Sequence, residues 1–246
     1  MASWPGPRVI AHRGGGRLAP ENTLAALRKG AALGARGVEF DVMLAADGVA
    51  VLMHDPEFGR TVPGPGAVAL TSAARLRALD AGSWYAPEYA GEPVPLFAEV
   101  VRYCVAQGMW MNAEIKPAPG FEVATGEAAG RVCLAAGVTA RAVLFSSFSR
   151  VAVAAVGRVA PGLPRALLMG RIASDWRDAL ADLGCVALHC DHRNLDAGTA
   201  GAVKAAGYGL MCYTVDTVER ARELFDWGVD AVCTDRPDLL HGLERG

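Results

Sequence analysis

Residues 109–117 of this chain have the sequence MWMNAEIKP. Three apolar residues lead into the segment, and the proline at its end stops regular strand pairing. Side chains alternate along a strand with a period of two, so Glu114 and Lys116 share one face. Burying such a pair costs free energy unless a cation and an anionic ligand are there to meet it. The segment therefore predicts a strand that ends in a polar site.

Two earlier segments have the same design. Residues 38–42 (VEFDV) put the carboxylates of Glu39 and Asp41 on one face of an apolar strand. Residues 9–14 (VIAHRG) end an apolar run on His12 and Arg13. We expect these segments and residues 110–115 to be successive strands whose ends meet around one metal and one phosphate.

The rest of the chain alternates short apolar bursts with Ala/Leu-rich helical stretches. Eight such units predict an α/β fold, a (β/α)8 TIM barrel, formed as a single domain over residues 1–246. Residues 48–53 extend the second strand or form a hairpin arm after the Asp47-Gly48 turn. Residues from about 56 to 95 break the rhythm and predict a small insertion after the second strand. The alternative is a doubly wound open sheet, but the glycines after the first strand lack the G-x-G-x-x-G spacing.

Composition excludes several classes of protein. With 246 residues, 52 % of them hydrophobic, the chain can bury a large core. A net charge of −2 without blocks of like charge argues against nucleic-acid binding. No apolar run is long enough for stable membrane insertion, and a cleaved signal peptide would remove a candidate catalytic histidine. The six cysteines form no C-x-x-C pair, which predicts reduced thiols in a cytoplasmic protein.

The polar residues at the predicted strand ends indicate a reaction. Three carboxylates from two adjacent strands cannot all stay ionised without a cation, and oxygen-only ligands favour one divalent Mg²⁺ or Ca²⁺. Arg13 and Lys116 supply positive charge for a phosphate. His12 and His54 can share the proton transfers, one accepting a proton from the nucleophile and the other donating one to the leaving alkoxide. This combination indicates phosphodiester cleavage; the predicted metal ligands are Glu39, Asp41 and Glu114.

The order of the motifs resembles the glycerophosphodiester phosphodiesterase family. His12-Arg13-Gly14 followed by Pro20-Glu21-Asn22-Thr23 is similar to the opening signature of that family. The later blocks occur in the order of the family: Glu39-x-Asp41-Val42, His54-Asp55, Leu79-Asp80-Ala81-Gly82-Ser83-Trp84, Asn112-x-Glu114-Ile115-Lys116, Ser147-Phe148 and residues 228–237. The resemblance covers residues 8 to 240.

The resemblance implies a barrel hydrolase that cuts glycerophosphodiesters to sn-glycerol 3-phosphate and an alcohol. It implies that His12 and His54 are the acid/base pair, that the three carboxylates bind the metal, and that Arg13 and Lys116 hold phosphate. Phe148 and Tyr213 are the further substrate-binding residues, and Tyr213 stands where the family often has tryptophan. The partner is a small molecule, and the protein is a monomer or a homo-oligomer.

Other interpretations of these residues remain open at this point. Lys116 would serve a Schiff-base lyase, which needs a dry pocket. The barrel would also suit a phosphodiesterase of lysophospholipid head groups, or a protein that only binds phosphodiesters. Three further expectations concern secondary features. We expect Asp235 to cap the last helix, and His189 and Asp191 to lie at the rim or contact substrate. We expect Trp84 and Tyr85 to form the core of the insertion, with the lining of a lid as the alternative.

Overall fold

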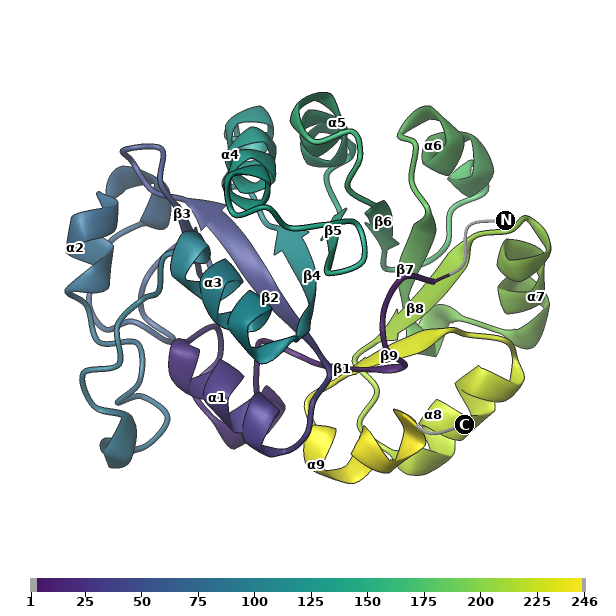
Figure 1. Cartoon of the computed structure of the whole chain (residues 1–246), viewed down its shortest axis with the longest axis horizontal. Coiled ribbons are helices and arrows are strands. Elements are labelled where there is room, and N and C mark those ends of the chain that lie inside the picture. Colours follow the sequence, from purple (N-terminus) through teal and green to yellow (C-terminus); the bar gives the residue numbers. More distant parts are fainter. Residues whose placement is uncertain (1–3, 245–246) are drawn as a thin grey trace.

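In the computed structural model, which describes residues 4–244, β1 (Val9–Ala11) pairs in parallel with both β2 (Gly37–Leu44) and β9 (Ala231–Thr234). This double pairing closes the sheet into a barrel (Figure 1). The other parallel strands of its wall are β4 (Trp110–Ile115), β5 (Val143–Ser147), β6 (Arg165–Met169), β7 (Ala187–Asp191) and β8 (Gly209–Tyr213). The predicted (β/α)8 barrel is confirmed. The open-sheet alternative is wrong because β1 would then lack one of its two neighbours.

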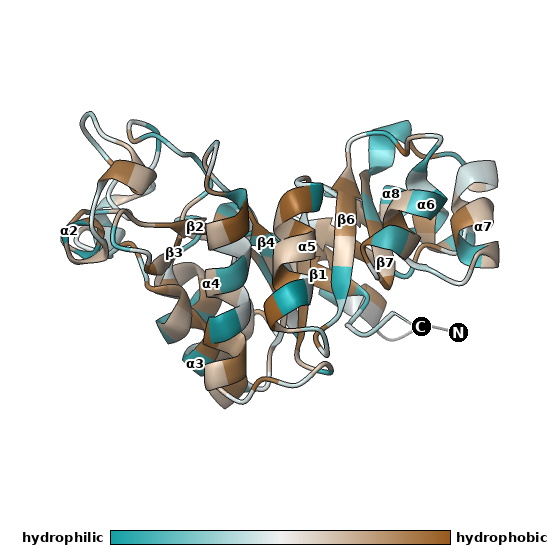
Figure 2. Cartoon of the chain, turned by 90° about the horizontal axis from the view of Figure 1, so that it is seen from above, coloured by the Kyte–Doolittle hydropathy of each residue, from teal (hydrophilic) through white to brown (hydrophobic). Residues whose placement is uncertain are grey.

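The helices that alternate with these strands lie outside the wall. They are α1 (Leu24–Ala32), α3 (Phe97–Gln107), α4 (Glu122–Ala135), α5 (Arg150–Val159), α6 (Trp176–Asp182), α7 (Ala197–Ala205), α8 (Val218–Asp226) and α9 (Pro237–Leu240). Figure 2 shows hydrophobic residues concentrated on the wall strands and hydrophilic residues mainly on the surrounding helices and loops. Since both faces of the strands are covered, the strands read as nearly continuous apolar runs.

The period of two along β2 separates its core residues from its polar ones. Phe40 faces outward and packs against Phe97 of α3, with ring centroids 5.9 Å apart. The carboxylates of Glu39 and Asp41 therefore face the inside of the barrel. Lower in the barrel, Trp110 belongs to an apolar interior cluster and packs against Trp4 with the two rings tilted by 51° and their centroids 5.5 Å apart. The polar interior residues thus gather toward the C-terminal ends of the strands.

The insertion has a small core of its own. Strand β3 (Ala50–Leu52) runs antiparallel to β2 after the Asp47-Gly48 turn, so the hairpin arm is the correct alternative. Residues 56–95 contain α2 (Ala73–Arg77) and the 3-10 turns η2 (Val68–Leu70) and η3 (Pro87–Tyr89). Their buried side chains, including Val62, Leu76 and Val94, pack with one another and with apolar residues of β2 and β3. The segment lies beside α1 at the edge of the barrel (Figure 1).

Two expectations from composition can be compared with the structure. All six cysteines are buried and free of disulfide bonds, as predicted for reduced thiols. None of the helices within residues 4–244 has both the length and the apolar character needed to cross a membrane. The predicted domain of residues 1–246 includes residues 1–3 and 245–246, which lie outside the described part of the chain.

Candidate active site at the C-terminal ends of the strands

A cavity of about 160 Å³ opens at the C-terminal ends of the barrel strands. The structure brings all nine predicted site residues to its wall, from segments spread over 200 positions of sequence: His12, Arg13, Glu39, Asp41, His54, Glu114, Lys116, Phe148 and Tyr213. The cavity also reaches Asn112, Leu168, Met211, Thr214 and Cys233. Parallel strands in a barrel end at one rim, which is why residues so distant in sequence meet there.

Three carboxylates form the centre of the cavity. Each of Glu39, Asp41 and Glu114 offers an oxygen, and the three oxygens lie within 4.8 Å of one another. Strand register explains the third member, because Asp41 of β2 stands opposite Glu114 of β4. Glu39 and Asp41 are only 3 % and 1 % exposed, and the buried Oε1 of Glu39 has no hydrogen-bond partner among the described residues. An unpartnered buried carboxylate oxygen in an oxygen-only set fits a hard divalent cation.

The pKa shifts of the three carboxylates also fit a site for a divalent cation. Burial raises the pKa of Glu39, and the neighbouring charge of Asp41 raises it further. Burial and the charges of Asp41 and Glu39 likewise raise the pKa of Glu114 well above its usual range. Burial also acts to raise the pKa of Asp41, but the charges of Lys116 and Arg13 outweigh it and lower that pKa. The folded protein therefore opposes joint ionisation of the three carboxylates, and an added cation would favour it.

Two residues with left-handed backbones hold the carboxylates in place. The φ angles are 51° at Arg13 and 57° at Asn22, a conformation that is uncommon for residues other than glycine. The backbone N–H of Arg13 donates to Glu39 at 2.9 Å. The amide of Asn22 donates to Oδ2 of Asp41 at 2.8 Å, and its oxygen accepts from the Asp41 N–H at 2.9 Å. Asn22 thus orients Asp41, whereas Thr23 caps α1 by accepting from Ala26.

His12 is held by an acid from the far end of the chain. Its Nδ1 lies 2.6 Å from Oδ1 of Asp235, and its Nε2 lies 3.8 Å from Oε2 of Glu39. Burial acts to lower the pKa of His12, but the hydrogen bond to Asp235 and the charge of Glu39 outweigh it and raise the pKa. The prediction that Asp235 caps the last helix is wrong. The N-cap of α9 is Arg236, and Asp235 turns instead toward the imidazole.

His54 also contacts an aspartate through Nδ1, but its pKa is shifted in the opposite direction to that of His12. Its Nδ1 lies 2.6 Å from Oδ1 of Asp55, the next residue in the chain. Burial is the largest influence and lowers the pKa of His54, and the positive charge of Arg13 lowers it further. The two histidines of the cavity therefore differ, since one is biased toward its protonated form and the other toward its neutral form.

A network that sequence reasoning missed supports these groups. Arg60 of the insertion donates to Asp55 at 2.6 Å and to both oxygens of Glu21 at 2.6 and 2.8 Å. Glu21 also accepts from Arg13 at 2.7 Å. The position of Glu21 in the Pro20–Thr23 block was the available signal for its role. Nothing in the local sequence around Arg60 points to the site.

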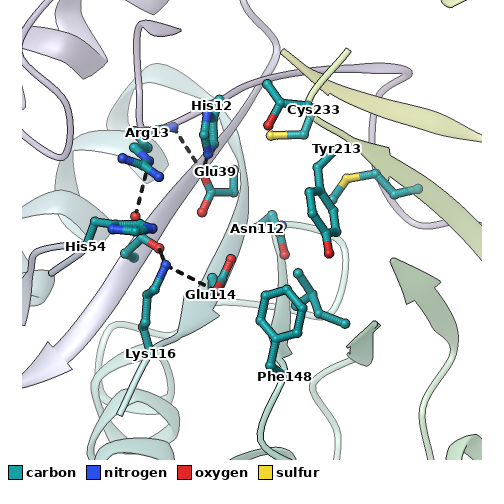
Figure 3. Close-up of a pocket in the computed structure, with 14 residues that line it drawn as sticks. His12, Arg13, Glu39, His54, Asn112, Glu114, Lys116, Phe148, Tyr213 and Cys233 are labelled. Atoms are coloured by element: carbon teal, nitrogen blue, oxygen red, sulfur yellow. Dashed lines mark hydrogen bonds and ion pairs between the residues drawn. The ribbon is translucent and has the colours of Figure 1, made fainter. Parts of the chain in front are cut away.

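The remaining predicted residues divide the cavity into two sides (Figure 3). On one side, Nζ of Lys116 lies 3.3 Å from Asp41, and Nε of Arg13 lies 3.6 Å from the same carboxylate. On the other side, the rings of Phe148 and Tyr213 meet edge to face, with centroids 6.1 Å apart. The cavity thus joins a cationic wall to an aromatic one, with the carboxylates between them.

The residues expected near the rim do not join this site. His189 has no exposed surface and lies inside the barrel near Trp4, with ring centroids 5.8 Å apart, so the predicted rim or substrate role is wrong. Asp191 pairs with Arg193 at 2.6 Å. Among the described residues, the three central carboxylates form the single group suited to a metal ion.

Cleavage of a phosphoric diester requires fixed positive charge near the phosphate and groups that move protons. Both occur in this cavity, at the rim where barrel enzymes carry their active sites. The protein is therefore a barrel phosphodiesterase, a hydrolase of phosphoric diesters. The model of the glycerophosphoryl diester phosphodiesterase family matches residues 12–239, and the chain belongs to that family.

Individual relatives agree with this assignment. The chain is 33 % identical to a glycerophosphodiester phosphodiesterase of Caldanaerobacter subterraneus, over 96 % of this chain and 97 % of the relative. A solved phosphodiesterase of Oleispira antarctica in complex with the product sn-glycerol-3-phosphate is 37 % identical, with a TM-score of 0.90 over 94 % of both chains. The glycerophosphodiester phosphodiesterase of Agrobacterium tumefaciens is 27 % identical, with a TM-score of 0.83 over 96 % of this chain and 99 % of that one.

Proposed function

We propose that this protein hydrolyses glycerophosphodiesters to sn-glycerol 3-phosphate and an alcohol. One divalent cation, Mg²⁺ or Ca²⁺, is held by Glu39, Asp41 and Glu114. The observation that carries the proposal is the single cavity that joins these carboxylates to two histidines and to the cations Arg13 and Lys116. The product bound to the Oleispira relative supports the identity of the products.

The proton transfers are assigned from the environments of the two histidines. His12, whose pKa is raised, is the general acid, and His54, whose pKa is lowered, is the general base. Environments that separate the pKa values of two groups in one site define such roles. Each Nδ1 already bonds an aspartate, so Nε2 is the nitrogen that each ring offers to substrate.

The reaction then proceeds in two balanced steps. In the first step, the 2-hydroxyl of the glycerol bonds to phosphorus and gives its proton to His54, while the bond from phosphorus to the alcohol breaks and the leaving oxygen takes a proton from His12. In the second step, His12 takes a proton from water, which attacks the cyclic phosphate. The glycerol oxygen leaves phosphorus and recovers a proton from His54. One water molecule is consumed, and both histidines return to their starting states.

The other polar groups bind rather than react. Arg13 and Lys116 hold the phosphate oxygens. When bound, the divalent cation would act as a Lewis acid that offsets the negative charge of these oxygens. The rings of Phe148 and Tyr213 form the wall for the glycerol carbons. Glu21, Asn22 and Asp235 position the groups that touch substrate.

The alternatives lack comparable support. A Schiff-base lysine needs apolar, dry surroundings, and Lys116 lies instead beside two carboxylates, Asp41 at 3.3 Å and Glu114 at 3.9 Å. An enzyme of lysophospholipid head groups would need a surface that docks on lipid.

We further propose that residues 1–246 form one domain with the insertion at residues 56–95, and that the protein works in the cytoplasm as a monomer or homo-oligomer.

The test is release of sn-glycerol 3-phosphate from a panel of glycerophosphodiesters, followed with a coupled dehydrogenase assay. We expect release that EDTA abolishes and that Mg²⁺ or Ca²⁺ restores. Release that is unaffected by EDTA would overturn the assignment of the metal. No release from any member of the panel would overturn the proposed function itself.

A further inference from the structure

A second cavity, of about 280 Å³, opens beside the first one and beneath the insertion. His12 and Arg13 line both cavities, so these two side chains form the boundary between the two spaces. The central carboxylates, Lys116 and the aromatic pair line the first cavity and do not line the second. The outer wall of the second cavity is formed by Arg17 and Asp235 from the barrel and by Trp84 and Tyr85 from the insertion.

Trp84 presents an uncovered aromatic surface to this space. It is 41 % exposed, which corrects the expectation that it forms the core of the insertion. Its indole N–H donates to the carbonyl of Ala81 at 2.9 Å, and its ring meets Tyr85 edge to face, with centroids 5.8 Å apart. The hydroxyl of Tyr85 donates to the carbonyl of Arg17 at 2.8 Å. The two rings are therefore fixed in place, and part of the indole is left for a ligand.

The charged side chains of this wall already have partners of opposite sign. Arg17 lies 3.0 Å from Asp216 and 3.3 Å from Asp235. Glu21, at the inner edge, pairs with Arg13 at 2.7 Å and with Arg60 at 2.6 Å. A charged ligand would lose hydration without finding a free counter-charge. A neutral ligand with several hydroxyls can instead hydrogen-bond to the outer atoms of these pairs and lay its C–H face on an aromatic ring.

We propose that the second cavity is the subsite for the alcohol half of the substrate, and that it selects a neutral polyhydroxy alcohol of the size of glycerol or inositol. This inference rests on the proposed function. A diester bound at the central carboxylates has two ester arms. One arm extends toward Phe148 and Tyr213, and the other passes His12 into the second cavity. His12 thus lies at the boundary where the alcohol separates from phosphorus.

Three kinds of diester can test the alcohol subsite separately from the cleavage of diesters in general. They are polyol esters (glycerophosphoinositol and glycerophosphoglycerol), a cationic ester (glycerophosphocholine) and the methyl ester of sn-glycerol 3-phosphate, whose alcohol is too small to reach Trp84. We expect the wild-type protein to have a higher kcat/KM for the polyol esters than for glycerophosphocholine. In Trp84→Ala, the ratio of kcat/KM for a polyol ester to that for the methyl ester should fall about tenfold, the size typical of one lost pocket contact.

Two further variants serve as controls. Trp84→Phe keeps an aromatic ring and should recover part of that ratio. Leu70→Ala removes a large apolar side chain that is 83 % exposed in the same insertion but lines neither cavity, so the ratio should stay at its wild-type value. Inhibition by sn-glycerol 3-phosphate, which lacks the alcohol half, measures whether the first cavity of Trp84→Ala is intact.

The outcomes separate the two proposals. If the wild-type protein cleaves none of the three kinds of diester, the proposed function is wrong and the subsite fails with it. If it cleaves glycerophosphocholine but no polyol ester, the function stands and the choice of a neutral alcohol is wrong. If it cleaves all of them and Trp84→Ala lowers kcat/KM equally for the methyl and polyol esters, the function stands and the subsite is wrong. A loss in Trp84→Ala that is largest for glycerophosphocholine would overturn the choice of a neutral alcohol.

Discussion

Oδ1 of Asp235 lies 2.6 Å from Nδ1 of His12, although the two residues are 223 positions apart in the chain. The contact exists because β1 and β9 are neighbours in the closed barrel, with Ala11 opposite Thr234. Asp216 fixes the acid in turn, since its Oδ1 accepts from the Asp235 N–H at 2.9 Å. Closure of the barrel thus sets the orientation and the charge of the proposed general acid.

This contact predicts the pH profile. The proposed mechanism requires neutral His54 and protonated His12, so we expect activity to rise as pH passes the lowered pKa of His54 and to fall as pH passes the raised pKa of His12. Asp235→Asn removes a charge that raises the pKa of His12. We expect its alkaline limb to move to lower pH and kcat to fall by about 10- to 100-fold. Asp238→Asn, whose carboxylate pairs with Arg236, is the matched control. An unmoved alkaline limb in Asp235→Asn would contradict the assignment of His12.

The two histidines should separate catalysis from metal binding. His12→Ala and His54→Ala each remove a proton-transfer group, so we expect turnover to fall by about 10²- to 10⁴-fold. Neither ring belongs to the carboxylate cluster, so calorimetric titration should still detect binding of the divalent cation. His241→Ala, an exposed histidine outside the cavity, controls for loss of an imidazole. Wild-type turnover in His12→Ala would show that the acid/base assignment is wrong.

Removal of one carboxylate should affect binding and turnover together. We expect Glu39→Ala to lose both, with partial rescue of turnover at high concentrations of Mg²⁺ or Ca²⁺, because two ligands remain. Glu57→Ala removes an exposed glutamate that does not line the cavity and should leave metal affinity unchanged. Full metal affinity in Glu39→Ala would place the ion elsewhere.

Metal binding should also depend on pH. The pKa values of Glu39 and Glu114 are raised in the folded protein, so protons compete with the cation as pH falls through these raised values. Without metal, the folded state binds the protons of Glu39 and Glu114 more tightly than the unfolded state does. The stability that these protonated groups contribute is therefore lost as pH rises above the ordinary pKa of glutamate. The gain in Tm on adding Mg²⁺ or Ca²⁺ should therefore grow from pH 5 to pH 8. A gain that shrinks over this range would contradict the proposed ligands.

Replacement of Asn22 should weaken metal binding more than replacement of its neighbour Thr23. Asn22→Ala removes both hydrogen bonds to Asp41, and we expect a loss of about 1–3 kcal/mol in the free energy of unfolding together with weaker metal binding. Thr23→Ala removes the cap of α1, with an expected loss of about 1 kcal/mol and unchanged metal affinity. Denaturant unfolding and calorimetry measure the two effects. Equal metal affinity in both variants would remove the positioning role of Asn22.

Lys116 provides a test of the competing chemistry. We expect Lys116→Met to lower kcat/KM by about 100-fold through loss of a fixed charge at the phosphate. Borohydride added with substrate should trap no adduct on the wild-type protein. A covalent adduct at Lys116 would support the Schiff-base lyase and contradict the phosphodiesterase mechanism.

The barrel and the residues that line the first cavity could be predicted from the amino-acid sequence. Residues 110–115 were predicted as a strand with the bounds that the structure gives, and all nine predicted site residues line one cavity. These features are local. The period of two places Glu39 and Asp41 on one face whatever the rest of the chain does, and parallel strands end at a common rim.

The contacts between groups that are distant in sequence could not be predicted and became known from the folded structure. The pairs His12–Asp235, Asn22–Asp41 and Glu21–Arg60 each join different segments of the barrel or insertion, and Trp84 became a cavity wall instead of a core residue. Local sequence cannot specify these contacts, because they depend on strand register, barrel closure and the way the insertion docks. The contact with Asp235 raises the pKa of His12, whereas burial in the folded protein lowers the pKa of His54, so the proposed direction of proton transfer depends on the fold.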